Sequence, residues 1–100
     1  MSYQRFKALT ELIKRYRSYD ESKYTIVICG FGTLSELRLK CVKALFETRE
    51  DKQEYFYGSR IILDTEISYD YLAVAYSDKV SGEISRLTEI KEEAVTNDSK

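Results

Sequence analysis

Apolar residues recur at helical spacing near the start of the chain. The positions are Phe6, Leu9, Ile13 and Tyr16, with Leu12 beside them. A period of three to four residues places these side chains on one face of a helix over residues 3 to 17. Residues 24 to 29 form an uninterrupted apolar and β-branched run, which is typical of a central strand covered on both faces. The polar residues 18 to 23 connect the two elements.

A second helix is predicted directly after the two glycines that end this strand. The sequence from Thr33 to Glu36 is a capping-box pattern, in which the Thr33 hydroxyl and the Glu36 carboxylate accept hydrogen bonds from main-chain amides of the first turn. An apolar stripe continues the helix to Arg49, through Leu34, Leu37, Cys41, Ala44 and Leu45. Residues 47 to 54 are charged, which predicts an exposed turn.

Two strands are predicted in the second half of the chain. Residues 55 to 63 are aromatic and β-branched, with Gly58 as a bulge or a point of close approach. Residues 68 to 77 alternate between two faces, and the short polar segment 64 to 67 predicts that these strands pair as an antiparallel hairpin. Residues 83 to 94 fit a helical stripe and also an alternating strand. We expect an extended or short helical segment at the sheet edge, followed by a disordered tail over residues 95 to 100.

The order helix, strand, helix, strand, strand predicts an α/β (α+β) fold. We expect a two-layer sandwich, with two helices on one face of a small mixed sheet. A chain of 100 residues allows one domain, which we place at residues 1 to 94.

The composition narrows the chemistry. The chain has no histidine, which excludes Ser-His-Asp and Cys-His mechanisms. Cys29 and Cys41 lie in apolar segments, so we expect buried thiols, with no disulfide and no zinc site. The sequence therefore predicts a protein that is not an enzyme and that uses no cofactor and no metal.

Membrane and export signals are not found in the sequence. No apolar run approaches the ~18 residues of a membrane span, and the first residues do not form the apolar segment of a signal peptide. We expect an intracellular protein, cytoplasmic or nuclear, with no membrane partner.

Charge is distributed unevenly along the chain. The net charge is −1, but residues 1 to 17 carry five bases and one acid, which is 5 − 1 = +4. Lys14, Arg15 and Arg17 end the predicted first helix. They form either a solvated helix face or a contact for nucleic acid.

The glycine turn has two interpretations. A dinucleotide fingerprint is not supported, because no strand leads into an acid about 20 residues downstream. A P-loop is excluded because no Gly-Lys-Ser/Thr follows the glycines. Gly30 and Gly32 provide either positive φ angles and backbone clearance at a sharp corner, or free amides that bind an anion such as a phosphate.

The strand, the turn and the following helix resemble the Alba superfamily of DNA- and RNA-binding proteins over residues 3 to 78. The matching residues are Ile26, Val27, Ile28, Gly30, Gly32, Ser35, Cys41, Ala44 and Leu45. The resemblance implies a two-layer sandwich, a homodimer or heterodimer, and nucleic-acid contacts at the glycine turn and the hairpin loop. Its eukaryotic relatives are protein subunits of RNA-processing ribonucleoproteins. The nucleic-acid contacts expected here are Gly30, Phe31, Gly32, Thr33, Arg38 and Lys40.

Nine tyrosines make the chain unusually rich in this residue. Those expected at an interface are Tyr55, Tyr57, Tyr69 and Tyr71, all in the predicted hairpin. They could stack unpaired bases, anchor a protein partner, or pack across strands. The favoured hypothesis is a module that binds RNA or DNA, as a dimer or a ribonucleoprotein subunit. The alternative is a small protein–protein interaction module, an assembly subunit or a phage- or virus-type inhibitor, with an acidic, tyrosine-rich surface.

Overall fold

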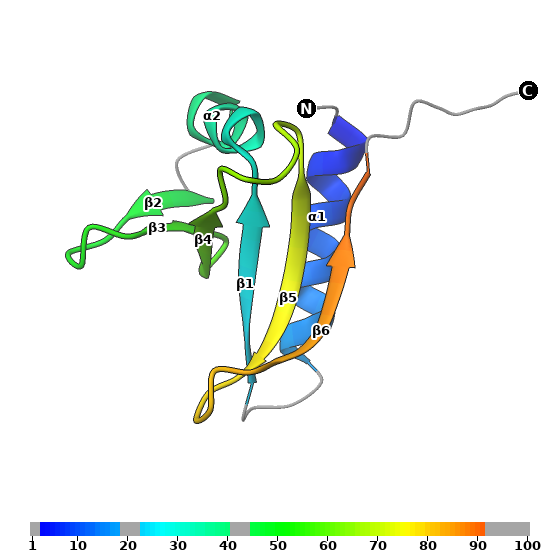
Figure 1. The fold of residues 1–100 in the computed structure, drawn as a ribbon, viewed down its shortest axis with the longest axis vertical. Coiled ribbons are helices and arrows are strands. Elements are labelled where there is room, and N and C mark those ends of the chain that lie inside the picture. Colours follow the sequence, from blue (N-terminus) through cyan, green and yellow to red (C-terminus); the bar gives the residue numbers. More distant parts are fainter. Residues whose placement is uncertain (1–2, 19–22, 41–44, 92–100) are drawn as a thin grey trace, which may run out of the picture.

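The computed structural model describes residues 3–18, 23–40 and 45–91, with the main chain alone at Lys23 and Lys40. Its elements are α1 (Tyr3–Arg17), β1 (Lys23–Cys29), α2 (Phe31–Lys40), β2 (Phe46–Thr48), β3 (Glu54–Phe56), β4 (Ser59–Leu63), β5 (Leu72–Asp78) and β6 (Ile84–Glu89). The strands form one sheet in the order β2-β3-β4-β1-β5-β6 (Figure 1). Two helices and a mixed sheet confirm the predicted α+β class and two-layer sandwich.

The first two predicted elements are confirmed. α1 buries Leu9, Ile13 and Tyr16, as the helical spacing of these residues requires. β1 pairs with parallel β4 on one edge and antiparallel β5 on the other, which confirms its central place. β6 pairs with β5 at the sheet edge, so the extended alternative for this part of the chain is the one observed.

The predicted second helix is too long. α2 ends at Lys40, and Phe46–Thr48 is strand β2 rather than helix. Phe46 is paired with Phe56 of β3, so sheet pairing between two aromatic residues overrides the helical period at this point. Cys41 and Ala44 lie outside the described residues.

The predicted long hairpin is also wrong. Residues 55 to 63 are not one strand: β3 and β4 form their own antiparallel pair. The turn between them contains Tyr57 (φ 51°) and Gly58 (φ 80°), so Gly58 marks a turn rather than a bulge. β4 and β5 do not pair, because β1 lies between them. β1 is covered by β4 and β5 on its two edges, as its continuous apolar run indicates.

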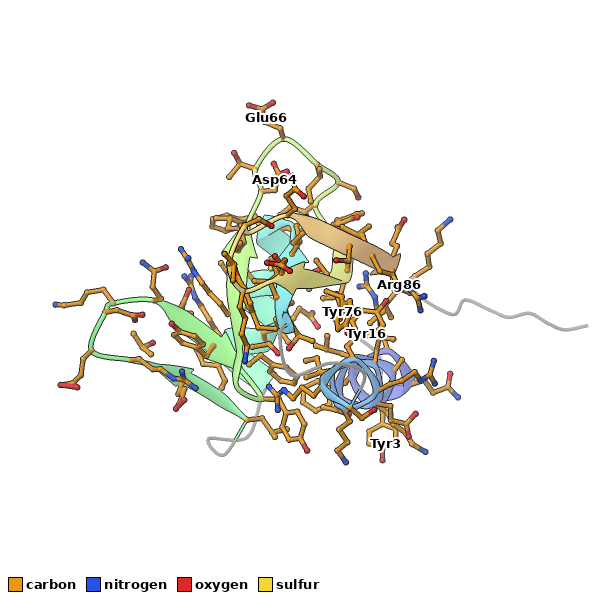
Figure 2. The ribbon with its side chains drawn as sticks, turned by 90° about the horizontal axis from the view of Figure 1, so that it is seen from below. Tyr3, Tyr16, Asp64, Glu66, Tyr76 and Arg86 are labelled. Carbon is orange, nitrogen blue, oxygen red and sulfur yellow. The ribbon has the colours of Figure 1, made fainter. Side chains whose placement is uncertain are left out.

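One core joins both helices to the sheet. Its buried residues include Leu9 and Ile13 of α1, Leu34 and Leu37 of α2, and Val27, Val74 and Phe56 of the strands. Tyr16 points toward Tyr76 of β5 (Figure 2), with the ring centroids 5.4 Å apart. The Tyr16 hydroxyl also forms a hydrogen bond with the Thr88 hydroxyl of β6. These contacts hold α1 against β5 and β6.

The face of the sheet opposite α1 is apolar and partly open. In Figure 1, α1 lies behind β5 and β6 as seen from this face. Its half-exposed side chains are Ile62 (37%), Tyr24 (41%), Leu87 (45%) and Ile84 (51%). An antiparallel sheet with one face in water usually carries polar residues there. This face, which we call the open face, is therefore unusual for its apolar content.

Candidate functional site

The loop before β5 closes the glycine turn. The Gly30 amide donates to the Tyr71 carbonyl (3.0 Å), and the Gly32 and Thr33 amides both donate to the Tyr69 carbonyl (2.9 and 3.3 Å). A methyl group on Gly32 would collide with the Tyr69 ring. These three amides are therefore not available to an anion in this structure. Backbone clearance, part of one of the two interpretations of the turn, accounts for Gly30, whose β-carbon would meet main-chain atoms of Ser68 and Tyr69, whereas the neighbour of Gly32 is a side chain.

Two details predicted for this turn are wrong. Among the described glycines, only Gly58 and Gly82 have positive φ, so neither Gly30 nor Gly32 is needed for a left-handed conformation. α2 begins at Phe31, which places Thr33 inside the first turn rather than at the cap. The Thr33 hydroxyl is buried and has no hydrogen-bond partner among the described residues.

The basic end of α1 docks on the turn between β3 and β4. The Arg17 guanidinium donates to the Tyr57 carbonyl and to the Ser59 hydroxyl, the latter at 3.2 Å. Its Cζ atom lies 5.1 Å from the centroid of the Tyr57 ring, and the Lys14 Nζ atom lies 5.7 Å from the same centroid. Burial of the guanidinium lowers the pKa of Arg17 from its usual value. Gly58 has φ 80°, a conformation that favours glycine, and a β-carbon there would lie 2.6 Å from Arg17 Nη2 and displace this guanidinium.

A second cation–tyrosine contact lies on the neighbouring β2–β3 hairpin. The Arg49 Cζ atom lies 3.8 Å from the centroid of the Tyr55 ring, and Arg49 Nε also pairs with Glu47 (2.8 Å). The Gln53 amide and the Tyr55 hydroxyl donate to the Asp51 carboxylate, each at 2.8 Å. These bonds lower the pKa of Asp51. The hydrogen bond to Asp51 likewise raises the pKa of Tyr55.

The two contacts involve side chains that lie far apart in the sequence, and Arg17 and Arg49 are near enough for their charges to interact. Lys14 and Arg17 come from α1, whereas Arg49, Tyr55 and Tyr57 come from the β2–β3 hairpin and the turn that follows it. We call these five residues the cation–tyrosine patch. Arg15 is exposed nearby on α1.

A shallow groove of about 300 Å³ lies between α2 and the β3–β4 strands. Its apolar lining consists of Leu34, Ile61, Ile62 and Leu63. Its polar lining consists of Arg38, Lys52, Gln53, Glu54 and Arg60. Arg38 holds Glu54 with two hydrogen bonds of 2.7 and 2.9 Å, and Arg60 donates to the Gln53 side chain at 3.0 Å.

The structure separates the other predicted site residues. Phe31 is 52% exposed at the start of α2, Arg38 is paired with Glu54, and the side chain of Lys40 lies outside the described residues. Tyr69 and Tyr71 contribute their carbonyls to the glycine turn. Asp64 and Glu66 lie on the side of the sheet away from α1 (Figure 2).

Sequence reasoning missed three arginines of this structure. The sequence pattern predicts a helix end at Arg49 and a strand that contains Arg60, and neither pattern indicates a functional side chain. The register that sets Arg60 beside Tyr55 depends on the β3–β4 turn, for which Gly58 was the available signal. Arg5 contributes to the positive charge of the predicted first helix, but its side chain is buried and donates to the Ile90 carbonyl (3.0 Å) and the Asp70 carbonyl.

Comparison with protein-family models, with curated proteins and with solved structures finds no match. The described residues contain no group of three or more metal-ligating side chains. Within the same residues, no helix is both long and apolar enough to cross a membrane.

Proposed function

We propose that the protein is a non-enzymatic module that binds single-stranded RNA or DNA at the cation–tyrosine patch. The observation that carries the proposal is the set of cation–π contacts at 3.8, 5.1 and 5.7 Å. Single-stranded nucleic acids are bound by cations that follow the phosphates and by aromatic or guanidinium planes that stack the bases. The two contacts of the patch offer both kinds of group.

Charge near the patch favours a polyanion. The cations of α1's last turn, the β2–β3 hairpin and β4 are Lys14, Arg15, Arg17, Arg49, Lys52 and Arg60. The acids between Phe46 and Gln53 are Glu47, Glu50 and Asp51, which gives 6 − 3 = +3. Glu54 is left out of this sum together with Arg38, because the two form an ion pair. A local charge of +3 on a chain of net charge −1 attracts phosphate to this end of the molecule.

The stacked Arg49 is suited to contact a base. Its guanidinium covers the Tyr55 ring, and 45% of its side chain remains exposed. An exposed guanidinium plane held on an aromatic ring can stack with an unpaired base on its other side. Bases in a duplex are already stacked and paired, so this contact favours single strands.

The test is fluorescence anisotropy with a labelled 12-nucleotide single strand of mixed sequence. With about four phosphate contacts, the slope of log affinity against log salt is near −2.8, which is about a 50-fold loss between 50 and 200 mM salt. Lys14→Gln is expected to reduce that slope by about 0.7. The matched control is Lys7→Gln, which removes an exposed charge from the first half of the same helix. Absence of binding at 50 mM salt would refute the proposal.

A second candidate function is protein–protein interaction through the open face. It is favoured by the exposure of Tyr24, Ile84 and Leu87, since apolar patches on a sheet mark contact sites. The chain alone tests self-association by sedimentation at ~10 to 500 μM. A dimer that Leu87→Lys dissociates would support this candidate, and a monomer throughout would remove the homodimer.

A further inference from the structure

We propose that the groove between α2 and β3–β4 holds one unpaired nucleotide of the strand bound at the patch. This inference rests on the proposed function and names the part of the ligand that this chain would contact in the groove. A ligand of the groove must match two features at once. One is an apolar wall, and the other is a pair of cations that form no ion pair among the described residues.

The apolar wall is formed by side chains that remain partly in water. Ile62 and Leu63 are 37% and 38% exposed and, as successive residues of β4, point to opposite faces of the sheet, whereas Leu34 and Ile61 are buried. A planar base covers such side chains by dispersion and apolar contact without needing a specific hydrogen bond. The apolar wall can therefore bind a base, and it does not discriminate between the four bases of the nucleic acid.

The cations of the groove differ in how far they are neutralised. Arg38 is bound bidentately by Glu54, so this pair contributes little net charge. The Arg60 guanidinium is held by the neutral Gln53 amide, and among the described residues the Lys52 side chain has no ion pair. Lys52 and Arg60 are thus the groups that would meet a phosphate.

The groove continues from the patch. Arg60 is paired in register with Tyr55, the ring on which Arg49 stacks. A single-stranded nucleic acid that stacks one base on Arg49 therefore places its next phosphate and base near Arg60 and the apolar wall. The volume of about 300 Å³ is at the small end of ligand sites, which limits the occupant to a group of about one nucleotide. A base paired in a duplex cannot enter.

The experiment compares a 12-nucleotide single strand with an abasic oligomer of equal length and charge, and with the matched duplex. We expect at least tenfold weaker binding of both comparison oligomers. Ile62→Thr keeps a β-branched residue in β4 and removes apolar surface, so it should weaken single-strand binding about fivefold and leave abasic binding unchanged. Lys52→Asn removes a charge at a backbone position with φ 69°, which asparagine tolerates, and should weaken both about threefold. Lys79→Gln, an exposed lysine in the β5–β6 turn, is the charge-matched control.

The outcomes separate the two proposals. No effect of Ile62→Thr on single-strand binding would overturn the groove while nucleic-acid binding stands, whatever the abasic result, because stacking at Arg49 also needs a base. Binding to a polyglutamate peptide as tight as to the single strand would assign the groove to an acidic peptide and overturn the inference. Absence of binding to every oligomer would refute the proposed function and the groove together.

Discussion

The two glycines of the β1–α2 turn should respond very differently to alanine. A β-carbon on Gly30 would lie 2.7 Å from the Tyr69 carbonyl oxygen and closer still to the Ser68 carbonyl oxygen. Both obstacles are main chain, so neither can rotate away. Gly30→Ala must therefore push the loop before β5 away from the turn.

The expected cost follows from the hydrogen bonds that this loop makes. Three amides of the turn, those of Gly30, Gly32 and Thr33, donate to the Tyr69 and Tyr71 carbonyls. Each such bond contributes about 0.5–1.5 kcal/mol, so losing all three lowers the free energy of unfolding by about 2–4 kcal/mol. With a urea m-value of about 1.5 kcal/mol/M, the unfolding midpoint moves down by roughly 2 M.

Gly32→Ala is the matched comparison. The atoms that its β-carbon would meet belong to the ring of Tyr69, a side chain that is 66% exposed and free to rotate. Alanine also gains up to about 1 kcal/mol in helix propensity over glycine, so we expect a change within about 1 kcal/mol of zero. Urea unfolding followed by far-UV circular dichroism measures both variants. Equal costs, or a neutral Gly30→Ala, would show that the loop does not close the turn, and the anion-site interpretation would then return.

Three further predictions address the rest of the fold. Arg5→Met leaves the buried Ile90 carbonyl and the partly buried Asp70 carbonyl without their donor and should cost about 2–4 kcal/mol in urea unfolding. Arg5→Lys should not restore the stability, because a single ammonium cannot replace the guanidinium fork. Lys52→Gly should raise the thermal midpoint, since it relieves about 1 kcal/mol of strain at φ 69°; no change would mean that the turn is unstrained. Burial, with a smaller contribution from Glu54, raises the pKa of Cys29 from 9.0 to about 11. In a Cys41→Ser background, alkylation at pH 8 should therefore be about 100-fold slower in the folded than in the urea-unfolded protein, and stability should fall as the pH rises from about 9 to about 11.

The spacing of apolar residues correctly predicted the elements whose conformation depends on neighbouring residues in the sequence. The helical spacing of α1 and the apolar run of β1 each specify one element, because the period alone decides which face is buried. Pattern failed where pairing with a distant segment decides the conformation. Phe46 continues the helical stripe, yet it lies in a strand because Phe56 is its partner.

Several residues of the candidate site could be predicted from the sequence, but their arrangement in space could not. The sequence indicates the cations Lys14 and Arg17 and the tyrosines Tyr55 and Tyr57 as site candidates, but nothing in it shows that α1 ends on the β3–β4 turn. That contact depends on the insertion of β1 between β4 and β5, which sets where the hairpin lies. The glycine turn shows the converse case. Its sequence resembles an anion site, but its amides donate to the carbonyls of Tyr69 and Tyr71. These carbonyls belong to a segment about 40 positions downstream, which the local sequence does not reveal.

The central claim is tested most directly by the affinity of the wild-type protein for a 12-nucleotide single strand as salt is raised from 50 to 200 mM. The account predicts measurable binding at 50 mM, weaker binding to the matched duplex, and a loss of about 50-fold at 200 mM. No binding at 50 mM, or an affinity that does not change with salt, would contradict it.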